Sequence, residues 1–370
     1  MKCLVIHNRR ASGPKESSWW TFHHISEELK RRGHLFAQYS IDFSLTDDAG
    51  TQITNRVWNE ADFIFTVFRN GIAPLKIAKM RDIPSFLEIN YACEQVATPF
   101  MEKEITRLGI GKDEIMYDHH NTNDDLYNSA TNLIGAGNRE YTEQTYRDHG
   151  LDHVKFFKAG IDCELFKPDF NLRSEHKKTN PRIRFTFTAA ALAFRKGIIH
   201  TLRAWRSLPQ EYHDKIELHF FGKPAYGKES IREYDAAMND FKNIIHHPFM
   251  SNQSKEYIYE HGISDVMLCP AFAEGQSATA LEGMAFGLYP IVSPYTGSDF
   301  EKMPGKILSK DPSSWVKEIA DSIRYVVDNY EEVKKTAPLI RGHAMRTYRY
   351  EDFAREVIDF MEEVHQKHKK

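Results

Sequence analysis

Residues 270–290, PAFAEGQSATALEGMAFGLYP, are the most informative segment of the sequence. It follows an apolar run at 266–269 that is typical of a buried strand, and it continues into a segment that is typical of a helix. Glu274 is therefore expected in the strand-to-helix loop, with Glu282 about two helical turns further on. This order predicts one β/α unit of a parallel sheet.

The start of that helix is a candidate anion site. Gln276, Ser277 and Ala278 would present backbone N–H groups at the helix N-terminus, where the helix dipole favours negative charge. If Glu274 and Glu282 lie on one side of the helix, both carboxylates can face an elongated ligand whose phosphates lie between them. The alternative is that Glu274 only caps the helix and Glu282 is a solvated surface residue.

The whole chain predicts two α/β domains. Its 370 residues are enough for two hydrophobic cores. Segment 167–181 is polar and charged without an apolar period, and we interpret it as a linker between domains at 1–166 and 182–349. Strands that alternate with helical patterns are expected at 3–6, 63–67, 85–89, 132–136, 185–188, 216–221, 266–269 and 289–292.

The composition limits the function classes. A net charge of −3 excludes the electrostatic footprint of a dedicated nucleic-acid binder. The four cysteines contain no C-x-x-C pair, so neither a zinc site nor a redox dithiol is indicated. The first apolar run is far too short for a signal peptide, and no run approaches the roughly 20 residues of a membrane-spanning helix. We expect a soluble or peripheral, cytoplasmic protein.

The 270–290 stretch resembles the donor-binding signature of retaining glycosyltransferases of family 4, formerly group 1. Seven residues separate Glu274 from Glu282, Gly275 follows the first, and Met-Ala-x-Gly-x-x-Pro follows the second from Met284 onward. Residues 159–168 resemble the family segment that leads from one domain to the other. Residues 185–197 resemble the family's strand and Lys-Gly loop.

The resemblance implies a GT-B fold, in which two facing, doubly wound Rossmann-like domains are joined by a C-terminal helix at about 350–370 that crosses back to the first domain. It further implies transfer of a sugar, with retention of configuration, from a nucleotide-diphosphate sugar to an acceptor hydroxyl. The partners would be that donor and a glycan or lipid-linked acceptor, in glycan, polysaccharide or glycolipid biosynthesis. No cofactor and no metal are expected.

The resemblance also assigns roles. Lys196 would contact the donor diphosphate. The family's assisting arginine, six residues earlier, is Ala190 here, and Arg195 is the expected substitute. Glu274 would orient the hydroxyls of the sugar, and Glu282 would bind the ribose. The alternative for both cations is a solvent-facing position at the start of a helix.

Further donor contacts are expected from the same resemblance. Gly222 would end a strand below the nucleotide, where a missing side chain permits close approach. Phe249 and Met250 would pack on the base; ordinary core packing is the alternative. In the first domain, Gly13 is the glycine that could bring backbone close to a phosphate or the acceptor.

A histidine near the transferred sugar is common in the first domain of the family. Asn90 and Tyr91 occupy the expected place, so His119 and His120 are the substitutes, with a polar surface loop as the alternative reading. The surrounding segment 118–125 matches no zinc spacing. Because Lys196 and backbone N–H groups would meet the charge of the diphosphate, we predict activity without metal.

Aromatic and basic residues near the first strand and helix suggest a second location, the inner face of an anionic membrane. The alternative is that the two tryptophans lie in the core or line the acceptor cleft. The residues concerned are Arg9, Arg10, Trp19, Trp20, Lys30, Arg31 and Arg32.

Two other functions use the same scaffold. One is a sugar-nucleotide epimerase or hydrolase, and the other is a non-catalytic protein that binds the donor. The sugar, the base and the acceptor stay open, because variable loops decide those contacts.

Overall fold

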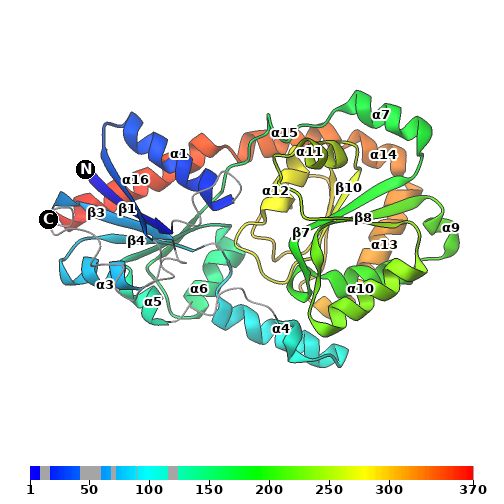
Figure 1. Ribbon diagram of the computed structural model, residues 1–370, viewed down its shortest axis with the longest axis horizontal. Coiled ribbons are helices and arrows are strands. Elements are labelled where there is room, and N and C mark those ends of the chain that lie inside the picture. The colour runs from blue at the N-terminus through cyan, green and yellow to red at the C-terminus, as the bar shows by residue number, and fades with distance from the viewer. Residues whose placement is uncertain (9–16, 42–59, 68–71, 90, 116–123, 370) are drawn as a thin grey trace. The chain divides into compact units, whose positions relative to one another are not determined.

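The computed structural model describes residues 1–8, 17–41, 60–67, 72–89, 91–115 and 124–369, with only the backbone at 6–8, 17–22, 36–41 and 67. These residues form two compact units, each built on a six-stranded parallel sheet with helices on both faces (Figure 1). Unit 1 comprises Met1–Glu94, Tyr117–Gly160 and Arg349–Lys370, and unit 2 comprises Gln95–Met116 and Ile161–Tyr348. The predicted pair of doubly wound α/β domains is confirmed.

Unit 1 has the strand order β2-β1-β3-β4-β5-β6, and every neighbouring pair is parallel. Apolar strands such as β4, which is buried along its whole length, are typical of a sheet covered on both faces. Its elements are β1 Lys2–Asn8, α1 Ser17–Arg31, β2 Leu35–Ile41, β3 Phe63–Val67, α3 Ala73–Met80, β4 Ser85–Ile89, α5 Asp124–Ser129, β5 Asn132–Ala136, a π-helix Arg139–Glu143, α6 Gln144–Asp148, β6 Val154–Phe157 and α16 Tyr350–His368.

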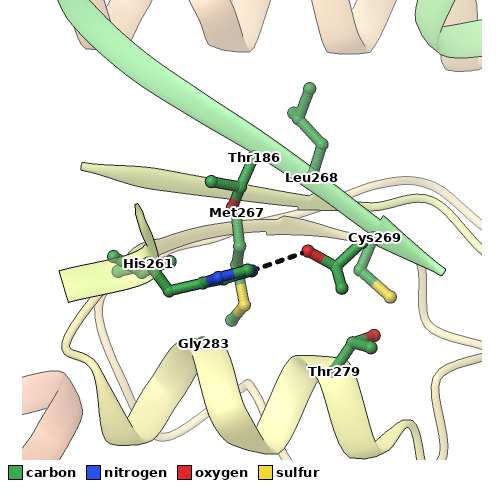
Figure 2. A pocket seen from close by; sticks show the side chains of 9 residues that line it. Thr186, His261, Met267, Leu268, Cys269, Thr279 and Gly283 are labelled. Carbon is green, nitrogen blue, oxygen red and sulfur yellow. Dashed lines mark hydrogen bonds between the residues drawn. The ribbon is translucent and has the colours of Figure 1, made fainter. Parts of the chain in front are cut away.

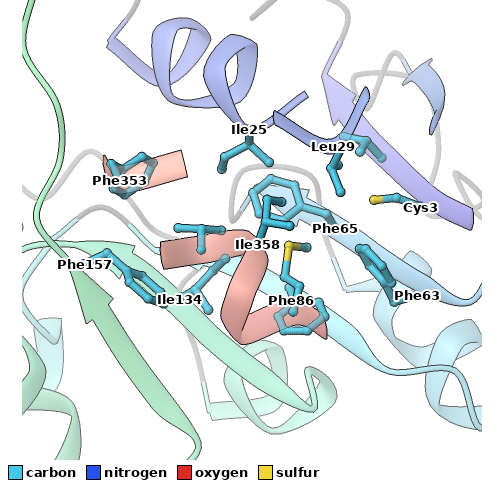
Figure 3. Close-up of a cluster of buried hydrophobic side chains, with 13 residues drawn as sticks. Cys3, Ile25, Leu29, Phe63, Phe65, Phe86, Ile134, Phe157, Phe353 and Ile358 are labelled. Atoms are coloured by element: carbon cyan, nitrogen blue, oxygen red, sulfur yellow. The ribbon is translucent and has the colours of Figure 1, made fainter. Parts of the chain in front are cut away.

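The core of unit 1 brings the two ends of the chain together. Phe353 and Ile358 of α16 are buried in one cluster with Ile25 of α1 and Phe86 of β4 (Figure 3). Arg32, just after α1, pairs with two acidic side chains of α16, at 2.7 Å and 3.1 Å. The predicted return of the C-terminal helix to the first domain is confirmed.

Unit 2 has the strand order β12-β11-β10-β7-β8-β9, again parallel throughout. Its elements are α4 Glu94–Leu108, a 3-10 turn Lys112–Glu114, α7 Phe170–Thr179, β7 Ile183–Ala193, the 3-10 turn η6 Phe194–Lys196, α8 Ile198–Arg206, α9 Gln210–His213, β8 Ile216–Tyr226, α10 Lys228–Asp240, β9 Ile244–His247, α11 Lys255–Gly262, β10 Val266–Cys269, α12 Ala278–Ala285, β11 Tyr289–Val292, β12 Lys306–Ile307, a 3-10 turn Pro312–Ser314, α13 Trp315–Asp328, α14 Tyr330–Lys335 and α15 Ala337–Thr347.

The strand order of unit 2 creates a switch point between β7 and β10. From β7 the chain adds β8 and β9 on one side of the sheet, and it then returns to add β10, β11 and β12 on the other. The loops after β7 and β10 therefore leave adjacent strands in opposite directions. Open parallel sheets bind ligands outside the carboxyl ends of their strands at such a point.

Two expectations about the domain boundaries need correction. The predicted linker at 167–181 contains helix α7, which Asp169 caps and whose Arg173 is buried against unit 2. Segment 95–115, assigned from sequence to the first domain, belongs to unit 2. In both segments polar residues are buried by pairing with distant partners, which the local hydrophobic pattern does not reveal.

Candidate functional site

A cluster of three charged side chains lies where β7 and β10 end. Oε1 of Glu274 lies 2.6 Å from Nζ of Lys196 and 2.6 Å from Nη1 of Arg195. Arg195 also donates to the carbonyl oxygen of Ala273, at 2.7 Å. All three charged side chains are largely buried, which excludes the alternative in which both cations face solvent.

The electrostatics of this cluster favour an anion. Burial opposes ionisation of Glu274, but Arg195 and Lys196 outweigh it and lower the pKa of the carboxyl group below its ordinary value. The ionised carboxylate and the two cations then carry one net positive charge. A ligand phosphate can therefore compete with Glu274 for Lys196 without leaving a buried cation unpaired.

Backbone hydrogen bonds hold the two loops in register. The N–H of Phe272 donates to the carbonyl oxygen of Arg195 at 2.8 Å, and the N–H of Glu274 donates to that of Tyr295 at 3.1 Å. Gly197 has a φ of +81°, and a side chain there would meet the carbonyl oxygen of Pro270. The Lys-Gly dipeptide thus lets the β7 loop lie directly against the β10 loop.

The N-terminus of α12 follows Glu274 closely, with Gly275 and Gln276 between the carboxylate and the helix cap. Ser277 caps the helix through its Oγ, so Glu274 is not the cap. The N–H of Ser277 donates to the carbonyl oxygen of Thr296 at 2.9 Å, which corrects its predicted role as an anion donor. The N–H of Ala278 has no acceptor among the residues that the structure describes, so it stays a candidate donor.

Glu282 is buried, which excludes the solvated alternative. Its Oε1 accepts a hydrogen bond from Nδ2 of Asn252 at 2.9 Å, and its Oε2 accepts one from the hydroxyl of Tyr257 at 2.5 Å. Burial raises the pKa of Glu282 although both hydrogen bonds oppose that rise. The two glutamates thus differ in kind: Glu274 is matched by cations, and Glu282 by neutral donors.

A small cavity of about 10 Å³ lies between α12 and strands β7 and β10, beside Thr279 and Cys269 (Figure 2). Nδ1 of His261 bonds to the carbonyl oxygen of Tyr257 at 2.9 Å, so Nε2 accepts from the hydroxyl of Thr188 at 2.8 Å. Burial lowers the pKa of His261 to about 3, which keeps the ring neutral. The space suffices for roughly one water, so it is not a nucleotide pocket.

The other predicted donor contacts have mixed outcomes. Phe249 is 59 % exposed, so core packing does not explain it, and Met250 beside it is half-buried. Gly222 has a φ of +143°, and a Cβ there would lie 1.8 Å from the carbonyl oxygen of Ala189. The glycine is thus required by the neighbouring strand irrespective of any ligand.

The predicted first-domain site lies largely outside the described residues. That holds for Gly13, Asn90, His119 and His120, whereas Tyr91 is half-buried in unit 1. Ala190, in the place of the family's arginine, is exposed on β7.

A group with metal-ligand chemistry lies elsewhere in unit 2. His219, His247 and Glu260 bring one ligand atom each within 4.8 Å of one another. Arg184 donates to Nδ1 of His219 at 2.6 Å and to Glu260, and Nε2 of His247 lies 2.8 Å from the same Nδ1. Because arginine only donates, this Nδ1 is the acceptor nitrogen of the ring and His219 is neutral. The guanidinium charge opposes a divalent cation here, so these residues do not fit a metal.

Sequence reasoning missed Tyr257 and Asn252, the two partners of Glu282. Tyr257 and His261 are four residues apart on α11 and stack at 3.9 Å. That spacing was the available signal, but the register of the helix against α12 cannot be read from one sequence.

The chain matches a family model. Residues 170–341 match the model of the family described as glycosyl transferases group 1. This match lies within unit 2 and supports a glycosyltransferase. None of the curated protein sequences matches the chain.

Solved structures support the fold over both units. Anabaena HepE in complex with UDP has a TM-score of 0.70 at 12% identity, over 98% of this chain and 100% of that one. Sucrose-phosphate synthase from Thermosynechococcus elongatus gives 0.72 at 11%, over 98% and 99%. WaaG, a glycosyltransferase involved in lipopolysaccharide biosynthesis, gives 0.63 at 14%, over 97% and 99%. At these identities the likeness confirms the predicted GT-B fold class and carries no further conclusion.

Proposed function

We propose that this protein is a retaining glycosyltransferase that moves a sugar from a nucleotide-diphosphate sugar to an acceptor hydroxyl. The observation that carries the proposal is the buried cluster of Glu274, Arg195 and Lys196 at the switch point of unit 2, next to the N-terminus of α12. A single net positive charge at this edge suits a donor whose diphosphate leaves with growing negative charge.

The residues divide the work as follows. Lys196, with Arg195 beside it, stabilises the departing diphosphate, and the N–H groups at the start of α12 add a fixed dipole. Glu274 holds the hydroxyls of the sugar beside the developing positive charge on its ring. Glu282 binds the ribose through a carboxylate oxygen that accepts a hydrogen bond from Asn252 or Tyr257 in this structure. Phe249 and Met250 pack on the base.

Retention follows from same-face attack. The acceptor hydroxyl attacks the anomeric carbon from the side that the diphosphate leaves, and the departing phosphate oxygen takes the hydroxyl proton. One C–O bond breaks and one forms, so no further reactant is needed. The acceptor is a glycan or a lipid-linked acceptor in glycan, polysaccharide or glycolipid biosynthesis.

Binding of a panel of nucleotide sugars tests the proposal first. UDP-sugars lead the panel, because the HepE complexes contain UDP and UDP-glucose. A true donor stabilises the fold by about 2.7 kcal/mol at a hundredfold excess over Kd. Transfer is then measured with acceptor sugars and the anomer assigned by NMR. Inversion would overturn the retaining mechanism, and release of free sugar or an epimer without acceptor would favour a hydrolase or epimerase.

We further propose that the reaction needs no metal, because cations of the chain meet the charge of the diphosphate. Activity is therefore expected to survive EDTA at the level of the untreated enzyme. Loss in EDTA that Mg²⁺ or Mn²⁺ restores would contradict this mechanism.

Peripheral binding to an anionic membrane also remains a proposal. No described helix is long and apolar enough to cross a membrane. Lys30 and Arg31 pair with Glu27 and Glu28, so these two cations are partly neutralised. Any attraction must then come mainly from Arg9, Arg10, Trp19 and Trp20, whose side chains lie outside the described residues. Flotation with anionic vesicles tests this.

A further inference from the structure

Residues 117–160 separate the segment that contains helix α4 from the rest of unit 2, yet this helix packs on the loops that hold the charged cluster. In the sequence, the helix connects strands β4 and β5, both of which belong to the sheet of unit 1. Its side chains nevertheless contact unit 2 at several points, and the segment Gln95–Met116 belongs to that unit. A crossover connection normally covers its own sheet, so this placement calls for a reason.

Phe100 provides the first contact. Its ring lies 5.9 Å from that of Phe272 and 4.8 Å from that of Tyr295, centroid to centroid. Phe272 is two residues before Glu274, and the carbonyl oxygen of Tyr295 accepts the N–H of Glu274. Phe100 therefore packs on both segments that fix the backbone of this glutamate.

Glu104 provides the second contact. It is buried, and its Oε1 lies 2.8 Å from Nε2 of His200 on α8 and 2.5 Å from Nη2 of Arg107. Burial opposes ionisation, but the bonds from Arg107 and His200 lower the pKa of Glu104 to about 2. Burial also lowers the pKa of His200, so its ring is neutral and donates through Nε2.

His200 transmits that contact to the cluster. Its ring lies 6.0 Å from Phe194, which directly precedes Arg195 and Lys196, and 5.2 Å from Phe272. Phe194 and Phe272 stack on each other at 4.8 Å. One aromatic layer thus lies behind both charged loops, and Glu104 fixes the ring of His200 within it.

Glu114 anchors the far end of the segment. Its carboxylate accepts the backbone N–H groups of Glu229 at 2.5 Å and Ser230 at 3.2 Å, and the Ser230 hydroxyl at 2.6 Å. These groups lie in the first turn of α10, where a carboxylate is favoured. The segment is therefore held on unit 2 at both ends and does not merely rest on it.

We propose that Phe100 and Glu104 are positioning residues that set the geometry of Arg195, Lys196 and Glu274. The inference rests on the proposed function for its consequence, because the cluster is what binds the donor diphosphate. Neither residue is expected to touch the donor. Their loss should loosen the two loops, and it should weaken the binding of any ligand that needs them in register.

The test compares Phe100→Ala and Glu104→Ala with Lys103→Ala, an exposed neighbour on the same helix. Hydrogen exchange followed by mass spectrometry reads the loops directly and needs no ligand. We expect at least tenfold faster exchange in peptides that contain the amides of Phe272 and Glu274 for both test variants. Lys103→Ala should match the wild type. Glu104→Gln, which keeps an acceptor for Nε2 of His200, should restore most of the protection.

UDP affinity, measured by calorimetry, gives the second readout, with a five- to fiftyfold loss expected for Glu104→Ala and little for Glu104→Gln. If the wild type binds UDP and the variants neither bind it less tightly nor exchange faster, the positioning role is wrong. If the wild type binds neither UDP nor any nucleotide sugar of the panel, the proposed function fails, and the exchange data still decide the positioning role. Faster exchange spread evenly over unit 2 would mean general destabilisation and would overturn the proposal.

Discussion

Two buried glutamates eight positions apart have opposite environments. Glu274 lies between two cations, and its pKa is lowered despite burial, whereas burial raises the pKa of Glu282 among neutral donors. The first can respond to charge that develops during a reaction. The second offers a hydrogen-bonding surface that is the same before and during it.

The first prediction concerns this contrast in the kinetics of the two variants. Glu274→Ala should lower kcat by a factor of order 10² to 10³, as for other lost contacts to a charged transition state. Glu282→Ala should mainly raise the donor KM, because a ribose contact is made equally in the ground and transition states. Lys196→Ala should resemble Glu274→Ala.

Steady-state kinetics with a nucleotide-sugar donor measures both effects, with Glu256→Ala on the exposed first turn of α11 as the control. Circular dichroism shows whether each variant is folded. Near-normal kcat in Glu274→Ala together with its loss in Glu282→Ala would mean that the roles assigned to the two residues are wrong.

Helix α7 is an element that the local sequence pattern does not predict. Its sequence is polar and lacks an apolar period, which is why it reads as a linker. The helix nevertheless has an Asp169 cap, and its buried residue is a cation. Nε and Nη2 of Arg173 donate to the carbonyl oxygens of Gly262 and Phe286, at 3.1 Å and 3.2 Å.

Arg173→Ala should therefore destabilise unit 2. Two buried carbonyl groups would lose their donor, at a cost of about 1–3 kcal/mol for each group left unpaired. Urea unfolding measures the change, and Glu175→Ala on the same helix is the control, since it removes only an exposed pair with Lys178. Equal stability of the two variants would show that α7 is held by other contacts.

The sequence predicts the features that depend on local patterns, and it does not predict those that depend on contacts between distant segments. The β/α order, the C-terminal helix and the loop position of Glu274 follow from apolar runs and from one motif. The partners of Glu282, the packing of α4 and the occupied N–H of Ser277 depend on contacts between segments far apart in the chain. One sequence carries no record of such pairing unless the residues lie at a helical or strand spacing.

Across the molecule as a whole, unit 2 contains a group of buried and half-buried histidines that are neutral when the protein is folded. Burial lowers the pKa of each of them, to about 4 for His247 and about 3 for His261. The ordinary histidine pKa, about 6.5, applies once the chain unfolds. The group comprises His200, His213, His219, His247 and His261.

Stability should therefore fall with pH below about 6.5, and mainly in unit 2. Between pH 6.5 and about 4 the unfolded state binds protons that the folded state rejects, so the free energy of unfolding decreases as the pH is lowered. Carboxylates with lowered pKa, such as Glu104 and Glu217 at about 2, lose their contribution to stability only below about pH 4.5. Histidines therefore dominate the pH dependence of stability between pH 6.5 and about 4.5.

Urea unfolding at pH 7.5 and pH 5, followed by the fluorescence of the buried Trp205 and Trp315, measures this dependence. Replacing one titrating ring, as in His261→Gln, should make the slope shallower even if the variant is less stable at both pH values. Equal stability at pH 7.5 and pH 5 would mean that these rings take up protons in the folded protein as readily as in the unfolded chain, and the neutral state assigned to His219 and His261 would not hold at pH 5.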